Sequence, residues 1–416
     1  MAGTGQSVGA RSLAEVRASF PALAGGRVVF DNPAGTQVPR QVVERMHAYL
    51  TRTNANGGGF FPATVATGEL VQQARHALAA FLRAPAPETM VLGANMTSLT
   101  YAVSRALARD WQPGDTVVVT RLDHDANISP WLQAAADRQC YVHWVDIEPG
   151  TGTLDLADYA RALDKRPRLV ALGYASNALG TINPVAEMTA QAHDAGALVY
   201  VDAVHYAPHG LIDVQALDCD FLACSPYKFF GPHIGVLYGK RELLEDVPAY
   251  RVRPAPHRPP GKWETGTPNF EGIAGTLGAL EYLQWLGGSD AAAPDTAGRP
   301  GYVRAMHAAR EHETRLSAAL LHELVETPGC TLYGLRDPAR LGERTCTYSF
   351  RLAHEAPRDT ARRLAAHGVN VWSGHNYAQA VMEAYGVLAT GSLVRAGAVH
   401  YNTLEEVARF GEALRA

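Results

Sequence analysis

A polar turn between two apolar runs reads Cys224-Ser225-Pro226-Tyr227-Lys228-Phe229-Phe230-Gly231-Pro232-His233. The run 221–223 precedes this turn and the run 234–238 follows it, and both are typical of buried strands. Lys228 is one of only four lysines in the chain. A lysine in such a turn is either a reactive amine with a lowered pKa or a strand-end lysine whose ammonium reaches water. The local sequence does not separate these two interpretations.

The composition is that of a globular protein with more than one core. The chain has 416 residues, of which 47% are hydrophobic and 19% charged, and this length favours two domains or one large domain with a satellite. Its net charge of -4 argues against a nucleic-acid partner, which requires a clustered basic excess. Residues 1–6 do not resemble a secretory signal, and no apolar run is long enough to span a bilayer, so no membrane partner is expected.

Cysteine usage gives an expectation about location. The chain has five cysteines, which is an odd number, and no two of them form a CxxC pair. This pattern favours a reducing cytoplasm over a disulfide framework or a zinc site.

Helical and strand patterns alternate between residues 69 and 201. Continuous apolar runs, typical of strands covered on both faces, lie at 89–92, 115–120, 141–145, 169–173 and 197–201. Helical spacing is found at 69–83, 99–109, 129–138, 155–163 and 184–195. This order predicts an α/β fold in which helices cover both faces of a mostly parallel sheet. Ligands of such folds bind at the carboxyl ends of the strands, where the polar motifs of this chain fall.

The C-terminal part predicts a smaller α+β unit. A long helix (302–324) precedes strand-like pieces at 347–352, 369–372 and 392–398 and helices at 359–367 and 403–414. The segment 287–301, rich in Gly, Ala, Pro and Asp, is typical of a hinge or a surface insertion. We therefore expect an N-terminal segment (1–26) packing with the small domain, a large cofactor-binding domain (27–286) and a small domain (302–416). Two irregular segments, 54–67 and 251–262, are expected to shape the substrate site.

Three turns at predicted strand ends carry groups that suit one cofactor. Thr97 and Ser98 open a helix, whose N-terminus favours a phosphate, although both residue types are also ordinary N-caps. Asp202 ends a buried strand and needs a cationic partner, either a protonated pyridine nitrogen or a structural salt bridge. His124, between two aspartates, is read as a ring stacked on a planar cofactor or as part of a surface turn. Adjacent residues on a turn cannot easily converge on a metal, so no metal site is predicted.

The ordered set of motifs carries a family resemblance. Its members are Ser176-Asn177-Ala178-Leu179-Gly180, Asp202 with His205, Ser225-Pro226-Tyr227-Lys228, and Glu264-Thr265-Gly266-Thr267-Pro268-Asn269. Together they resemble the class V aminotransferase family of pyridoxal-phosphate enzymes, and within it the SUF-type cysteine desulfurases of iron–sulfur assembly and their desulfurase-like relatives. The resemblance runs from about residue 30 to the last helix. It implies fold type I of the pyridoxal 5'-phosphate (PLP)-dependent transferases, with a mostly parallel seven-stranded sheet in the large domain.

The resemblance also implies a role for each matching residue. Lys228 is expected to form the Schiff base with PLP, Asp202 to hold the pyridine nitrogen and His124 to stack on the ring, and these three are the predicted catalytic residues. The remaining cofactor contacts are assigned to His205 near the ring hydroxyl, where the desulfurases usually carry Gln, to Thr97, Ser98, Ser225 and Tyr227 at the phosphate, and to Thr267 from the neighbouring subunit of a homodimer. The substrate contacts are assigned to Asn177, which is also expected to contact the cofactor, and to Arg395, whose guanidinium suits an α-carboxylate.

One position departs from the desulfurase pattern. The desulfurases carry a catalytic cysteine after a Gly-His pair, whereas this chain reads Trp372-Ser373-Gly374-His375-Asn376-Tyr377-Ala378, with Tyr377 in the place of the cysteine. Tyr377 and His375 are therefore predicted to line the substrate site, where Tyr377 contacts the leaving group or fills space. Cys224 lies in the strand before Lys228 and is expected to be a buried, inert thiol.

The predicted function is that of a PLP-dependent enzyme acting on an α-amino acid. The leading interpretation is a lyase that removes a β-substituent, of the carbon–sulfur β-lyase type, through a Schiff base on Lys228 and a quinonoid. The alternatives are a cysteine desulfurase that uses another thiol, an aspartate β-decarboxylase, a carbon–carbon bond-forming enzyme and an aminotransferase. A non-catalytic scaffold is disfavoured, because a scaffold has no use for a complete set of cofactor residues.

Overall fold

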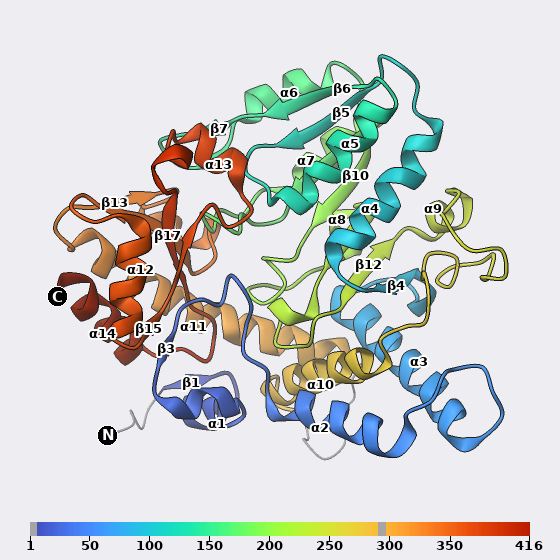
Figure 1. The fold of residues 1–416 in the computed structure, drawn as a ribbon, viewed down its shortest axis with the longest axis horizontal. Coiled ribbons are helices and arrows are strands. Elements are labelled where there is room, and N and C mark those ends of the chain that lie inside the picture. Colours follow the sequence, from blue (N-terminus) through green and yellow to red (C-terminus); the bar gives the residue numbers. More distant parts are fainter. Residues whose placement is uncertain (1–5, 290–296) are drawn as a thin grey trace.

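The fold is built on a seven-stranded sheet (Figure 1), seen in a computed structural model that describes residues 6–289 and 297–416. Strand β12 runs antiparallel to both of its neighbours, and the other strand pairs are parallel. The mostly parallel sheet of the prediction is thereby confirmed. In spatial order the strands are β4 Met90–Gly93, β12 Gly235–Gly239, β11 Phe221–Cys224, β10 Leu198–Asp202, β9 Leu169–Gly173, β5 Thr116–Thr120 and β6 Tyr141–Val145.

Helices cover both faces of this sheet. Alternate residues of β5 point to opposite sides, so Val118 joins one core cluster while Val117 and Val119 join another. The first cluster includes buried residues of α3, α6, α7 and α10, and the second those of α4 and α5. The helices of this part of the chain are α3 Pro62–Leu82, α4 Met96–Leu107, α5 Ser129–Asp137, α6 Leu156–Leu163, α7 Val185–Asp194, α8 Val214–Leu217, α9 Arg241–Asp246 and α10 Phe270–Leu286.

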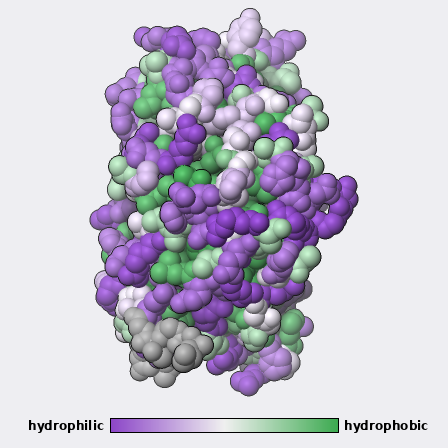
Figure 2. Space-filling view, turned by 90° about the vertical axis from the view of Figure 1, so that its left-hand side faces the viewer, coloured by the Kyte–Doolittle hydropathy of each residue, from purple (hydrophilic) through white to green (hydrophobic). Residues whose placement is uncertain are grey.

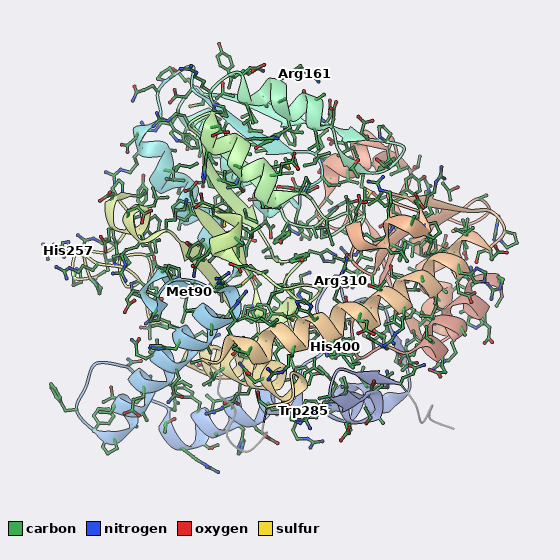
Figure 3. All side chains as sticks on the ribbon, turned by 180° about the vertical axis from the view of Figure 1, so that it is seen from behind. Met90, Arg161, His257, Trp285, Arg310 and His400 are labelled. Atoms are coloured by element: carbon green, nitrogen blue, oxygen red, sulfur yellow. The ribbon has the colours of Figure 1, made fainter. Side chains whose placement is uncertain are left out.

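A second, antiparallel sheet forms the C-terminal part. Its order is β13-β14-β17-β16, and a third core cluster lies between it and the helices α11, α12 and α14. Figure 3 shows α11 from behind, with Arg310 labelled on it, running from the large sheet toward the small one. The elements here are α11 Arg299–Val325, β13 Cys330–Tyr333, β14 Thr347–Leu352, α12 Pro357–Ala366, β15 Val369–Asn370, β16 Trp372–Gly374, α13 Gln379–Ala384, β17 Leu393–Gly397 and α14 Leu404–Arg415.

The N-terminal residues lie against the C-terminal part. Strand β3 Val28–Val29 pairs in parallel with β15, and Arg17 of α1 Leu13–Ala18 forms an ion pair with Glu406 of α14. The small pairs β1 Ser7–Val8 with β2 Arg11–Ser12 and β7 Ile147–Glu148 with β8 Thr153–Leu154 complete the strands. Of the predicted hinge 287–301, residues 290–296 lie outside the described residues. The division into domains therefore stays a prediction.

Three element boundaries differ from the prediction. The helix expected at 69–83 begins at Pro62, because proline fits the first helical position, where its fixed φ is favourable and its missing N–H is not needed. The apolar spacing at 41–51 predicts a single helix. The structure has α2 Arg40–Ala48, which continues as a π-helix, Tyr49–Thr53. The strand expected at 369–372 is split, because β15 pairs with β3 whereas β16 pairs with β17.

The face of the molecule shown in Figure 2 is mostly hydrophilic. Hydrophobic residues are scattered between the hydrophilic ones. Within residues 6–289 and 297–416, no helix combines the length and the hydropathy that a bilayer span requires.

Candidate active site

Lys228 is a buried amine at the end of the central sheet. It closes a 3₁₀ turn, Pro226–Lys228, directly after β11, and only 8% of the residue is exposed. Its Nζ donates a hydrogen bond to the carbonyl oxygen of Pro33. Burial and, to a smaller extent, the Arg395 charge lower the pKa of Lys228 from 10.5 to about 7, although Asp202 opposes both. The solvated strand-end interpretation of Lys228 is therefore wrong, and the amine has the properties of a reactive one.

An inner cavity lies at the carboxyl ends of the strands, next to Lys228. Asp202 ends β10 and lines this cavity, and its Oδ1 accepts a hydrogen bond from Val204 N (2.8 Å). Burial raises the pKa of Asp202 to about 6, although the Lys228 charge lowers it. The lining residues are Asn95, Met96, Thr97, Asp123, His124, Ala126, Gly173, Ala175, Asn177, Asp202, Val204, His205, Ser225, Tyr227 and Lys228.

Local hydrogen bonds fix the turn that carries His124. Asp123 accepts hydrogen bonds from Thr120 Oγ1, Asn127 Nδ2 and Gly173 N, all between 2.7 and 2.9 Å, which anchors the turn after β5. The Nδ1 of His124 accepts from Ala126 N (3.0 Å). Burial, with the nearby Lys228 and Arg395 charges, lowers the pKa of His124 to about 3. His124 therefore presents a neutral, oriented ring to the cavity.

Two further groups of the inner cavity connect separate elements. His205 is buried, and its Nε2 is 3.3 Å from Thr345 Oγ1 and 3.2 Å from Thr347 Oγ1, which come from the C-terminal part. Ser225 Oγ accepts from Met96 N at the start of α4 (3.3 Å). The helix α4 thus presents its N-terminus to the cavity, where its dipole favours an anion.

Arg395 and Asn177 present unpaired polar atoms where the inner cavity meets an outer one. Arg395 lies on β17 and donates through Nη1 to Asn177 O (2.9 Å), while its buried Nε has no partner. Asn177 donates through Nδ2 to Asn376 O (2.8 Å), and its buried Oδ1 is unpaired. Because an unpaired buried polar atom is costly, these atoms mark a place for a polar ligand group. A carboxylate suits the guanidinium.

A loop of the C-terminal part closes one side of the outer cavity, whose volume is about 730 Å³. Tyr377 O accepts from Asp125 N (2.6 Å), so the loop is joined directly to the turn of His124. The ring of Tyr377 is stacked with that of His124, with centroids 5.5 Å apart. The lining residues are Pro33, Ala34, Thr97, Tyr101, His124, Asp125, Ala126, Ser129, Pro130, Asn177, Tyr227, Lys228, Trp372, Ser373, Gly374, His375, Asn376, Tyr377 and Arg395.

Two of the sequence-predicted site residues do not line these cavities. The backbone N–H of Ser98 donates to the Asn95 side chain, so Asn95 is the N-cap of α4. Thr267 lines a separate cavity of about 700 Å³, together with Arg75 and Glu264, which form an ion pair (2.6 Å). The other predicted residues all line the inner or the outer cavity, namely Thr97, His124, Asn177, Asp202, His205, Ser225, Tyr227, Lys228, His375, Tyr377 and Arg395.

The sequence analysis missed two aromatic residues that line the outer cavity, but it described Cys224 correctly. Two aromatic residues that were given no role line the outer cavity: Tyr101, one turn into α4, and Trp372, which opens the quoted motif that contains Tyr377. Their aromatic character next to motif residues was the available signal. Cys224 is buried and its thiol pKa is raised by burial, as expected for an inert thiol. None of the five cysteines lines either cavity.

Comparison with known proteins places the chain in a family. The aminotransferase class V family model matches residues 28–297 and 302–410, and the chain belongs to that family. It is 33% identical to a cysteine desulfurase of Pectobacterium atrosepticum over 423 aligned positions, covering 97% of each chain. It is 34% identical to a cysteine desulfurase of Dickeya dadantii, covering 95% of this chain and 94% of the relative.

Solved structures give the same result. The fold matches an apo cysteine desulfurase from Thermococcus onnurineus with a TM-score of 0.84 and 28% identity, covering 97% of each chain. It matches the S-sulfonic acid form of a cysteine desulfurase from Escherichia coli with a TM-score of 0.83 and 28% identity, again covering 97% of each chain. The predicted fold type I and the relation to the desulfurases are thereby confirmed.

The protein is a PLP-dependent enzyme, and its residues fit that cofactor. The buried Asp202 carboxylate lacks a cation that a protonated pyridine nitrogen supplies, and the α4 N-terminus with Ser225 provides donors for a phosphate. The buried Lys228 amine opens onto the same cavity. The predicted cofactor is thus consistent with the chemistry of the cavity as well as with the family.

Proposed function

We propose that the protein is a carbon–sulfur β-lyase that acts on a cysteine-like α-amino acid. In this reaction the Cα–H and Cβ–S bonds break, the sulfur leaves with the bonding electron pair, and water is consumed. The products are a thiol, pyruvate and ammonium. One observation carries the proposal. Lys228, whose pKa is lowered, and Arg395, whose Nε is unpaired, line an outer cavity that has no cysteine among its lining residues.

The residues of the inner cavity support PLP binding in defined roles. Bound PLP supplies an electron sink for the pair released at Cα. Asp202 would hold its ring nitrogen in the charged form, and His124 would lie on its ring. His205, kept neutral by burial, would face the ring hydroxyl. Thr97, Ser98, Ser225 and Tyr227 are proposed at the phosphate; of these, Ser98 is supported by its place in the first turn of α4 alone.

Lys228 and Arg395 divide the work on the substrate. Arg395 would clamp the α-carboxylate through its unpaired Nε edge, with Asn177 beside it, which orients the Cα–H bond. Lys228 Nζ would take the proton from Cα, because an amine with a pKa of about 7 is about half unprotonated at neutral pH and still basic enough. The burial that lowers this pKa also excludes water from the reacting atoms.

Desulfurase activity is the second candidate, and the named relatives favour it. It would need a thiol that receives sulfur from the substrate. Cys224, Cys219 and Cys346 are buried with raised thiol pKa, and Cys330 also has its pKa raised, to about 11. A thiolate is therefore disfavoured at each of these positions. The lyase route needs no protein thiol, which is why we prefer it to the desulfurase route.

We also propose that the enzyme acts as a homodimer in the cytoplasm. Thr267 lines a different cavity from Lys228, together with Asn56 and Gly57, which precede the exposed Phe60 and Phe61, and this suits a contact with the neighbouring site. The five free cysteines support a reducing compartment.

Product analysis tests the lyase proposal. Purified holoenzyme is incubated with L-cysteine, S-substituted L-cysteines and L-aspartate, and pyruvate, thiol or sulfide, and alanine are measured. We expect pyruvate and thiol in equal amounts from an S-substituted cysteine. Alanine formed together with protein-bound persulfide would establish the desulfurase instead, and alanine from aspartate would establish the decarboxylase.

A further inference from the structure

The outer cavity has an aromatic wall beyond the reacting groups. Tyr101 from α4 and Trp372 and Tyr377 from the C-terminal part line it, together with Pro130 at the start of α5. Trp372 is 52% exposed and Tyr377 67% exposed, so both rings have faces open to the cavity or to water. Large aromatic faces left uncovered in a ligand cavity favour an apolar, planar ligand group.

The same cavity has no spare lysine or arginine among its lining residues. Its lysine and arginine are Lys228 and Arg395, which already have roles at Cα and at the α-carboxylate. The Nδ1 of His375 accepts a hydrogen bond from Tyr377 N (3.0 Å), so this nitrogen is already occupied within the loop. The acidic group in the wall is Asp125. A second carboxylate on the substrate would therefore face aromatic rings and an aspartate without a free lysine or arginine as its partner.

The loop that carries Tyr377 is held in a strained shape. Asn376 (φ 51°) and Tyr377 (φ 54°) both have positive φ, which is unfavourable for a bulky residue such as tyrosine. Asp125 N donates a hydrogen bond to Tyr377 O and Asn177 Nδ2 donates one to Asn376 O, and these contacts with the large-sheet part compensate for the strain. Strain maintained by contacts at a cavity wall is typical of a functional constraint on the position of a side chain.

We propose that this wall selects α-amino acids with an aromatic group one atom beyond Cβ, and that Tyr377 is the main specificity-determining residue. The inference rests on the proposed lyase function, in which the corresponding substrates are S-aryl conjugates of L-cysteine. The aryl ring would lie against Tyr377, Trp372 and Tyr101 while Arg395 holds the α-carboxylate. The aryl thiol that is released would then leave through the open side of the outer cavity.

A matched series of amino acids tests the selectivity independently of catalysis. L-Norvaline, L-homophenylalanine and L-glutamate share Cα, Cβ and Cγ and differ in the group on Cγ, which is methyl, phenyl or carboxylate, and none has a sulfur to release. Their affinity for the holoenzyme is measured by titration calorimetry. We expect homophenylalanine to bind about tenfold more tightly than norvaline and glutamate about tenfold more weakly. Equal affinities for homophenylalanine and norvaline would overturn the proposal.

Variants of Tyr377 assign the selectivity to its ring. Tyr377→Ala is expected to remove most of the tenfold preference for homophenylalanine and to leave the norvaline affinity unchanged within about twofold. Tyr377→Phe should keep the preference, because the ring and not the hydroxyl makes the contact. Tyr141→Ala, which truncates an exposed tyrosine on β6 outside the cavities, serves as the matched control. An equal loss of affinity for all three ligands in Tyr377→Ala would show a structural role and contradict the assignment.

A parallel lyase assay separates this inference from the proposed function. Pyruvate release is compared for S-phenyl-L-cysteine and S-methyl-L-cysteine. A higher kcat/KM for the phenyl compound, by about tenfold, supports both proposals. Tight homophenylalanine binding without pyruvate release would overturn the lyase function and uphold the aromatic selectivity. Pyruvate release that is as fast from the methyl compound would uphold the lyase and overturn the selectivity.

Discussion

The inner and outer cavities share Lys228 and His124 but are built in different ways. The inner cavity is made by the ends of β10 and β11 and the start of α4, which are elements of one sheet and its covering helices. The outer cavity is closed by a loop from the other sheet, held there by a few hydrogen bonds. With the proposed roles, the chemistry would reside in the sheet part, whereas the choice of substrate would reside in a loop that substitutions can change at little structural cost.

Replacing Lys228 is expected to have the largest effect on activity, and it tests the role of the inner cavity in the chemistry. Lys228→Ala is expected to lower kcat by about a thousandfold or more, equal to about 4 kcal/mol of activation free energy, because both the cofactor attachment and the Cα base are lost. Borohydride treatment followed by mass spectrometry should find the cofactor fixed to Lys228 in the wild type and not in the variant. Lys165→Ala, at an exposed position contacting His143, is the control and should keep full activity. Retained attachment in Lys228→Ala would falsify the assignment of this lysine.

The pH dependence of cofactor attachment tests whether the charges of Arg395 and Asp202 set the pKa of Lys228. Attachment needs the free amine of Lys228, so its rate should rise with pH through about 7 and then level off. Arg395 lowers the pKa of Lys228, so Arg395→Ala should move this rise to higher pH. Asp202 raises the same pKa, so Asp202→Asn should move it to lower pH. The rate is followed by absorbance after adding PLP to enzyme from which the cofactor has been removed.

The control for these shifts is an arginine outside both cavities. Arg351 lies on β14 and donates to Thr390. Arg351→Ala should leave the pH profile unchanged. A profile that moves in the same direction for Arg395→Ala and Asp202→Asn would contradict the electrostatic account, because the two charges have opposite signs.

The inner cavity could be anticipated from the sequence because its residues follow strands. Lys228 comes directly after an apolar run and Asp202 ends another, and parallel strands bring such ends to one edge of a sheet. The order of the strands could not be derived in this way, because it depends on contacts between distant segments. Thr267 shows the same limit, since its motif is clear in sequence whereas its distance from Lys228 depends on the whole fold.

The outer cavity was harder to predict, for physical reasons. Trp372 reaches it from β16 and Tyr101 from α4, and no local pattern joins them. The positive φ of Tyr377 results from its hydrogen bond with Asp125 N, a tertiary contact that opposes the local preference of tyrosine. By contrast, the early start of α3 could have been found from Pro62, which fits a first helical position.

The smallest expected effect concerns the stability of the outer loop. Tyr377→Gly should increase the free energy of unfolding by about 1 kcal/mol, because glycine adopts positive φ without the strain of a side chain and the exposed ring contributes little burial. Urea denaturation of the holoenzyme measures the change. Tyr141→Gly, at an equally exposed tyrosine that is in a strand and not at positive φ, is the matched control and should lower stability by a similar amount. If both substitutions lower stability equally, the loop stores no strain. A more stable Tyr377→Gly variant that also loses aromatic selectivity would show that this loop gives up stability in order to place a ring beside the substrate.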